Sequence, residues 1–536
     1  MKNRTIIFLL LLFASALFFF PGCSSDSGTS GHPKNKVPIS IEEEVQRLIA
    51  DLTSQGFEVK RGYFKLYTQD DCSYSYETMK SCYGNNPAAP YIMFAVPSWP
   101  EEFVDPATKL AFGKVAKGCN GTFRFDPREA IVIIGLMPPP AAYFGLQTYL
   151  FTREGTFDTS SPTYQFIATH FPAMLGTFFT QVPINTNRIQ LVASLSNNNN
   201  NVVVQQQSGA AFDQKRSFII TPDQFMDTAV RASLNKVEFE SSNIFTEPIP
   251  SVPDNLSAVR TGLDEHADEL IWVMRYAMPF DGGGSGTPSE TWKKDLPLIV
   301  LRVRDTKQGR AAQPYGPVVL EPRTAINESW LQADLANLVS AVNSKWGQPC
   351  SNADCSDQGT TSFIDLQSSP VNLVGPKCME IGMNCLGDTQ DTTYQGTPNL
   401  SLDDGQIYAV VGTLGTETGN ATYVGLAVNE SLMVKGLANI DSDQLKNTAM
   451  SYAGQVNNAD KFYVYYFTRD CSDLEALTEG NCFSISDTMI QPCSDPTTQT
   501  CDYLKLVQRE YIATGTRRGP DSTLTLLPKL LMLKRR

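Results

Sequence analysis

His266 is the first residue whose type and setting could support acid–base chemistry. It lies in the run Asp264-Glu265-His266-Ala267-Asp268-Glu269. An imidazole that titrates near neutral pH beside carboxylates can shuttle a proton or bind a metal. The competing interpretation places His266 at the edge of a helix's apolar face, four residues before Leu270, where it packs or pairs with an acid. We favour this structural role, and keep His266 and Glu265 as weak catalytic candidates.

The remaining histidines and serines are weaker candidates for catalysis. His170 precedes Phe171-Pro172 in a turn-like context and is a third weak catalytic candidate, whereas His32 lies near the N-terminus in a polar stretch. The sequence around Ser285 lacks the last glycine of a serine-hydrolase nucleophile turn. A carboxylate-based hydrolase stays open, because two acids suffice for sugar or acyl chemistry without a histidine.

Cysteines are numerous, and most of them fall in close pairs. The chain has 12, and in an oxidising compartment their spacing predicts disulfides. The expected pairs are Cys72 with Cys82, Cys350 with Cys355, Cys378 with Cys385, Cys471 with Cys482, and Cys493 with Cys501. Cys119 is left over and is expected to be a buried thiol, although spacing alone does not fix connectivity.

The same cysteines do not favour a metal centre. No Cys-x-x-Cys occurs, and there are 3 histidines. Closed zinc sites need four Cys or His ligands in tight pairs, whereas each short loop here separates its cysteines by more residues. We therefore expect no metal and no cofactor.

The N-terminal 22 residues have the organisation of a signal peptide. Lys2 and Arg4 precede an apolar run over residues 6–20, and Gly22 stands directly before Cys23. The run is too short to span a membrane, and no basic stop-transfer flank follows it. The segment resembles the type II signal peptide of bacterial lipoproteins, although Phe20 and Pro21 depart from that motif. The resemblance implies cleavage before Cys23 and acylation of its thiol.

The residues after Cys23 suit a lipid-anchored tether. Residues 23–39 begin with a Ser- and Gly-rich stretch of low complexity, which would keep a folded body away from the bilayer. Ser24 in place of Asp implies, by the same resemblance, an outer-membrane lipoprotein facing the periplasm or the surface. An ordinary secretory signal with an unmodified Cys23 is the alternative.

Charge argues against nucleic acid as a partner. The chain carries 43 Lys and Arg against 56 Asp and Glu, a formal net charge of −13. Loss of Lys2 and Arg4 with the signal peptide makes the mature chain more acidic still. Phosphate backbones and anionic lipid would repel such a body, so the lipid on Cys23 is the expected link to the membrane.

The expected elements of the first half mix helices and strands. Ser40 opens a capping box for a helix whose buried face is Ile41, Val45, Leu48, Ile49 and Leu52. Strands are expected at 130–136 and 143–151, with a corner at the three prolines 138–140 between them. The asparagines 197–201 are read as a hairpin or surface loop. A helix is expected over 259–278, then a strand at 296–303.

The second half is expected to be richer in strands. Residues 347–400 form a Cys-containing loop region between an N-terminal α/β part, 40–346, and a strand-rich part, 401–536. Strands are expected at 407–412, 421–428, 462–468 and 504–512, with a hairpin turn at 412–419 and a helix at 442–453. The fold class is α+β, with largely antiparallel sheets, packed helices and disulfide-pinned loops.

Several stretches resemble uncharacterised exported proteins of bacteria and fungi. The most telling are Phe125-Asp-Pro-Arg-Glu-Ala-Ile-Val-Ile-Ile-Gly and Tyr143-Phe-Gly-Leu-Gln-Thr-Tyr-Leu-Phe-Thr-Arg. Segments starting at Thr418 and Arg509 belong to the same pattern. The resemblance implies a shared extracytoplasmic fold and carries no functional residue.

These observations favour a lipid-anchored envelope protein that binds a partner or ligand without catalysing a reaction. The alternative is an extracytoplasmic hydrolase with a carboxylate-based site. Acids from separate segments that meet in one deep pocket, with raised carboxyl pKa values, would favour the enzyme.

Overall fold

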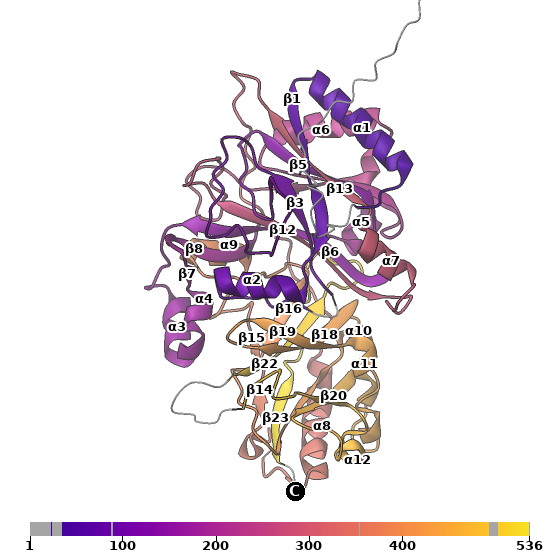
Figure 1. Ribbon diagram of the computed structural model, residues 1–536. Coiled ribbons are helices and arrows are strands. Elements are labelled where there is room, and N and C mark those ends of the chain that lie inside the picture. The colour runs from indigo at the N-terminus through magenta and orange to yellow at the C-terminus, as the bar shows by residue number, and fades with distance from the viewer. Residues whose placement is uncertain (1–22, 24–34, 87–88, 353, 493–501, 535–536) are drawn as a thin grey trace, which may run out of the picture.

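Two helix–sheet–sheet sandwiches make up the body of the protein in the computed structural model, which describes residues 23, 35–86, 89–352, 354–492 and 502–534. Figure 1 shows the N-terminal sandwich, indigo to magenta, above the C-terminal sandwich, orange to yellow. Most strand pairs are antiparallel, and the exceptions are β10 with β11 and β20 with β21. The expected α+β class is confirmed.

The N-terminal sandwich has a five-stranded and an eight-stranded sheet. The five strands run in the order β1 (Phe57–Arg61), β13 (Leu298–Asp305), β5 (Glu129–Leu136), β10 (Lys215–Thr221) and β11 (Ile244–Pro248). The main path of the other is β2 (Tyr63–Leu66), β3 (Ile92–Pro97), β12 (Glu269–Pro279), β6 (Ala141–Glu154), β8 (Asn185–Ser194) and β7 (Gln181–Val182). Short strands β4 (Cys119–Asn120) and β9 (Asn199–Asn200) join β3 and β6.

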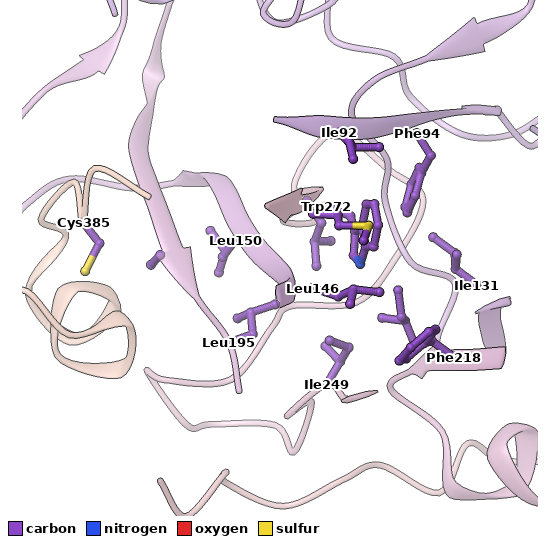
Figure 2. Close-up of a cluster of buried hydrophobic side chains, with 14 of the residues drawn as sticks. Ile92, Phe94, Ile131, Leu146, Leu150, Leu195, Phe218, Ile249, Trp272 and Cys385 are labelled. Carbon is purple, nitrogen blue, oxygen red and sulfur yellow. The ribbon is translucent and has the colours of Figure 1, made fainter. Parts of the chain in front are cut away.

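The core of this sandwich lies between its two sheets. In Figure 2, Ile131 and Phe218 from the smaller sheet approach Leu146 and Trp272 from the larger one, and all four are almost wholly buried. On the outer face of the smaller sheet, α1 (Ile39–Ser54) and α6 (Gln224–Lys236) form a second core. The five residues expected on the buried face of the first helix are all buried in α1.

The C-terminal sandwich repeats these layers. One sheet has the order β14 (Thr361–Ser362), β23 (Lys529–Lys534), β17 (Gln406–Thr413), β20 (Phe462–Thr468) and β21 (Cys482–Ser484). The other runs β15 (Ile364–Asp365), β16 (Thr392–Gly396), β22 (Leu504–Tyr511), β18 (Tyr423–Glu430) and β19 (Lys435–Asp441). Helix α8 (Gln332–Lys345) covers the outer face of the first sheet, so the chain crosses into this sandwich before residue 346.

Shorter helices connect and flank the sheets. In the N-terminal sandwich these are α2 (Gln69–Met79), α3 (Pro162–His170), η1 (Pro172–Met174), α4 (Leu175–Phe178), α5 (Asn201–Ser208) and α7 (Pro288–Asp295). Helix α9 (Gly375–Ile381) packs on β8, while α10 (Gly415–Thr418), α11 (Ser442–Leu445) and α12 (Glu475–Thr478) belong to the C-terminal sandwich.

The prediction of a helix over residues 259–278 is wrong. Residues 269–279 form strand β12, whose successive side chains enter two different cores: Leu270 and Trp272 join one, and Ile271 and Val273 the other. A strand buried on both faces reads as a continuous apolar run, and periodicity does not distinguish such a run from a buried helix.

Three local expectations are also wrong. Helix α1 starts after Pro38 without a side-chain cap, so Ser40 forms no capping box. Strands β17 and β18 lie in different sheets joined by α10, so no hairpin forms at 412–419. The helix expected at 442–453 is α11 followed by a separate 3-10 turn, Met450–Tyr452, because the backbone leaves the helical region at Lys446.

The disulfides largely follow the expected pairing. Four expected pairs are bonded, at Cys72–Cys82, Cys350–Cys355, Cys378–Cys385 and Cys471–Cys482. The fifth, Cys493 with Cys501, lies outside the described residues. Cys119 is not a thiol, which corrects the expectation: it is bonded to Cys23, with their Cα atoms 5.5 Å apart. Spacing cannot reveal a pair separated by 96 residues.

Candidate ligand-binding pocket

A mostly apolar cavity of about 100 Å³ lies where the two sandwiches meet. One wall comes from the helical segment α3–η1–α4 of the N-terminal sandwich, including Phe171 and Phe178. A second comes from the segment 364–398, and the third is the outer face of the sheet that contains β22. No single part of the chain forms this pocket.

Strand β22 contributes two cations to the pocket. Lys505, Val507 and Arg509 alternate along the strand and all line the cavity, whereas Leu504 and Leu506 point into the core of the C-terminal sandwich. This division follows from the two-residue period of a strand. Lysine and arginine therefore enter an apolar space from one face of one strand.

Small residues flank Val507 on both neighbouring strands. Val507 is flanked by Gly396 on β16 and Ala427 on β18. A Cβ atom at Gly396 would stand 3.4 Å from Leu366, another residue that lines the pocket.

The charged form of the Lys505 amine has little to stabilise it. Its Nζ contacts the thioether sulfur of Met174 at 2.6 Å, and thioethers are weak acceptors. Burial lowers the pKa of Lys505 to about 7. The lysine side chain is half-buried, so the low pKa reflects apolar surroundings of the amine more than complete enclosure.

Arg509 also has donor capacity to spare. Its Nη2 donates to the carbonyl oxygen of Gly84 at 3.2 Å, and its guanidinium lies 6.0 Å from the ring centroid of Tyr394. Within the described part of the chain, its buried Nε has no hydrogen-bond acceptor. A buried donor without an acceptor costs free energy, which a ligand oxygen would recover.

The carboxyl groups at the pocket are already engaged. Asp388 accepts hydrogen bonds from the amide and hydroxyl of Ser194 at 2.9 and 2.7 Å, from the amide of Gly375 at 3.0 Å, and from Gln390. Glu430 accepts from two backbone amides in the turn that follows it. Burial raises the pKa of Asp388 to about 6 and also raises the pKa of Glu430.

A buried polar cluster next to the pocket joins the two sandwiches. Asp391 accepts from the hydroxyl of Tyr143 at 2.7 Å and from the amides of Asn198 and Asn200, each at 2.9 Å. Burial raises the pKa of Asp391 to about 6. The asparagine run is therefore no surface loop, which corrects that expectation: Asn198 to Asn201 are buried, and the carboxamides of Asn198 and Asn200 bind this carboxyl group.

The predicted catalytic residues are not brought together. The side chain of His266 is 67% exposed and lies 3.0 Å from Glu154, whose hydrogen bond raises the pKa of the imidazole; Glu265 is 3.8 Å away. His170 is exposed at the end of α3, where it stacks on Phe166. Neither histidine lines the cavity, and His32 lies outside the described residues.

The structure identifies Lys505 and Arg509 instead, which sequence analysis missed. The strand at 504–512 was expected, and its alternation places both cations on one face. That signal is also typical of a solvated strand face, so it does not distinguish a pocket from a surface. Among the described residues, no group of three or more His, Cys, Asp or Glu side chains is placed to hold a metal.

Comparisons with known proteins add little. No family model matches the chain, and no curated protein matches it. Two crystal structures align with 92% of the chain at 9% identity: an uncharacterized protein from Burkholderia cenocepacia (94% of that chain, TM-score 0.33) and a protein from Vibrio parahaemolyticus (96%, TM-score 0.32). Likeness at these TM-scores supports no further conclusion. In the described part of the chain, no helix has the length and apolar character to cross a membrane.

Proposed function

We propose that this protein is a lipid-anchored envelope protein that binds a small molecule with an apolar body and an anionic head. The observation that carries the proposal is the division of charge in the pocket. Lys505 and Arg509 keep unused donor capacity, whereas the oxygens of Asp388 and Glu430 accept hydrogen bonds from the protein itself. A carboxylate on the ligand would accept hydrogen bonds from Lys505 and Arg509. It would gain no interaction from Asp388 and Glu430.

The size of the cavity limits the ligand. Its volume of about 100 Å³ is smaller than the ~150 Å³ apolar cavity that accommodates benzene in an engineered protein. The apolar body of the ligand is therefore limited to at most one small ring or a short branched chain, and the carboxylate lies at the cations. Apolar contact then stabilises the complex by about 25 cal/mol for each Å² removed from water.

Calorimetric titration with phenylacetate tests this proposal, with toluene as the uncharged probe. The variants are Lys505→Met and Arg509→Met, and the matched control is Lys109→Met, on an exposed lysine. A hydrogen bond to a charged group contributes about 1.5–3 kcal/mol, so each pocket variant should bind roughly tenfold or more weakly. The proposal fails if wild type binds no phenylacetate, or if all three variants bind it as wild type does.

The lipid anchor rests on the sequence around Cys23. Acylation of this thiol and the disulfide to Cys119 exclude each other, because both use the same sulfur atom. Mass spectrometry of the mature N-terminal peptide distinguishes them. The proposal requires that the mature lipidated protein carries an acylated Cys23 and a Cys119 thiol in place of the disulfide seen in the structure. A Cys23–Cys119 peptide without lipid would refute the anchor and, with it, the outer-membrane location.

A carboxylate-based hydrolase is the second candidate, favoured by one observation. Asp388 and Glu430 come from separate segments, line one pocket, and both have a raised pKa. If the protein is a hydrolase, Asp388→Asn should lower turnover of aryl esters or glycosides by about a hundredfold or more. No turnover by wild type would exclude this candidate for those substrates and leave the binding proposal intact.

A further inference from the structure

We infer that Lys505 captures aldehydes or ketones in the pocket as a reversible imine. The inference rests on the pocket described under the proposed function and adds a covalent step at one atom. The carbonyl carbon of the ligand bonds to Nζ of Lys505 while the apolar body of the ligand fills the cavity.

The surroundings of Nζ carry this inference. Several other lysines pair with acids, as Lys215 does with Glu44 at 2.6 Å and Lys236 with Asp51 at 2.9 Å. Lys505 contacts the Met174 sulfur, and no ion pair is found for it among the described residues. An amine without a counter-ion in an apolar pocket favours its neutral form, which is the nucleophile.

The other ionisable groups of the pocket do not supply that counter-ion. Asp388 lies on the segment before β16, and its oxygens accept from Ser194, Gly375 and Gln390. Glu430 ends β18, and its oxygens accept from the next turn. Tyr394 and Arg509 are the remaining ionisable groups, and the guanidinium would disfavour a second positive charge nearby.

The protonation state supports the same chemistry. With a pKa of about 7, half of the Lys505 amines are neutral at pH 7. An ordinary lysine has a pKa of about 10.4, so only roughly one in a few thousand is neutral at that pH. The supply of nucleophile at Lys505 is therefore about a thousandfold larger.

The reaction balances without an added oxidant or reductant. The lone pair of Nζ attacks the carbonyl carbon, and a C–N bond forms. The carbonyl oxygen leaves as water with the two protons that the amine carried, and a C=N double bond remains. Water reverses each step, so the ligand is released unchanged.

Reductive trapping tests the inference on the full mature protein. Benzaldehyde is added with cyanoborohydride, which delivers hydride to the imine carbon and fixes a benzyl group on the lysine, and peptides are mapped by mass spectrometry. We expect Lys505 to be modified at least tenfold faster than the exposed Lys109, with a rate that rises through pH 7. Toluene should slow the reaction at Lys505 and leave Lys109 unaffected.

Two variants and one binding measurement keep the outcomes distinct. Lys505→Arg keeps the charge without an imine-forming amine, and Lys505→Met keeps the length of the side chain. Both variants should lose the fast modification. Both should also have the same unfolding temperature as wild type, which shows that they are folded. If phenylacetate binds but Lys505 reacts no faster than Lys109, the imine is refuted and the binding proposal stands. If phenylacetate does not bind and Lys505 does not react, both fail.

Discussion

The buried carboxyl group of Asp391 should make the protein less stable as the pH rises. Burial raises the pKa of this group from 3.8 to about 6 in the folded protein, against the hydrogen bonds from Tyr143, Asn198 and Asn200, which favour the charged form. Between these two pH values the folded state binds more protons than the unfolded state. The contribution of Asp391 is therefore complete below pH 3.8 and is lost as the pH rises through about 6.

The size of this effect follows from the same values. The interval from 3.8 to about 6 corresponds to about 3 kcal/mol, an upper figure for one fully buried group. Asp391→Asn removes the ionisation and should reduce the difference in unfolding free energy between pH 5 and pH 8 by about 1.4 kcal/mol, because the rest of the effect is already lost below pH 5. Asp388 and Glu247 have pKa values raised to about 6 and about 7, so part of the slope should remain.

Urea unfolding at several pH values measures that difference. The variant also loses an acceptor for one of the three donors, which lowers its stability by about 1–3 kcal/mol. That loss is common to all pH values, so the slope is the informative quantity. Asp404→Asn, in an exposed loop, is the matched control. An unchanged slope in Asp391→Asn would refute the assignment of the pH dependence to this cluster.

Three further perturbations have outcomes fixed by the structure. Arg302→Met should lower the unfolding free energy by about 3–5 kcal/mol in urea, because Arg302 is fully buried and bonds Glu129 at 2.5 Å and Glu102 at 2.6 Å; a change below 1 kcal/mol would contradict this. His266→Ala should change stability by less than about 0.5 kcal/mol and leave phenylacetate binding intact, whereas lost binding would restore His266 as a site residue. Joint replacement of Cys378 and Cys385 by serine should lower the free energy of unfolding by about 2–4 kcal/mol, and it should weaken phenylacetate binding because Cys385 lines the pocket. Phenylacetate binding equal to that of wild type would contradict the role of Cys385 in the pocket.

Local patterns in the sequence were enough for elements that bury one face. The helix at α1 was predicted with its five buried residues, because an amphipathic helix carries its burial pattern in its own periodicity. Strand β5 is buried on both faces, but its apolar run is short and is followed by prolines that cannot continue a strand, so this strand and the corner after it were predicted as well. Four disulfides followed from spacing, since each closes a short loop.

Tertiary structure decided what lies between distant segments. The apolar run of β12 forms a strand because each of its two faces packs into a core. Asn198 and Asn200 are buried because they donate hydrogen bonds to Asp391. The pocket depends on Lys505, Phe171 and Asp388 meeting from three parts of the chain. A sequence records the chemistry of each residue, but the solvation and pairing that set its pKa are supplied by neighbours that only folding brings close.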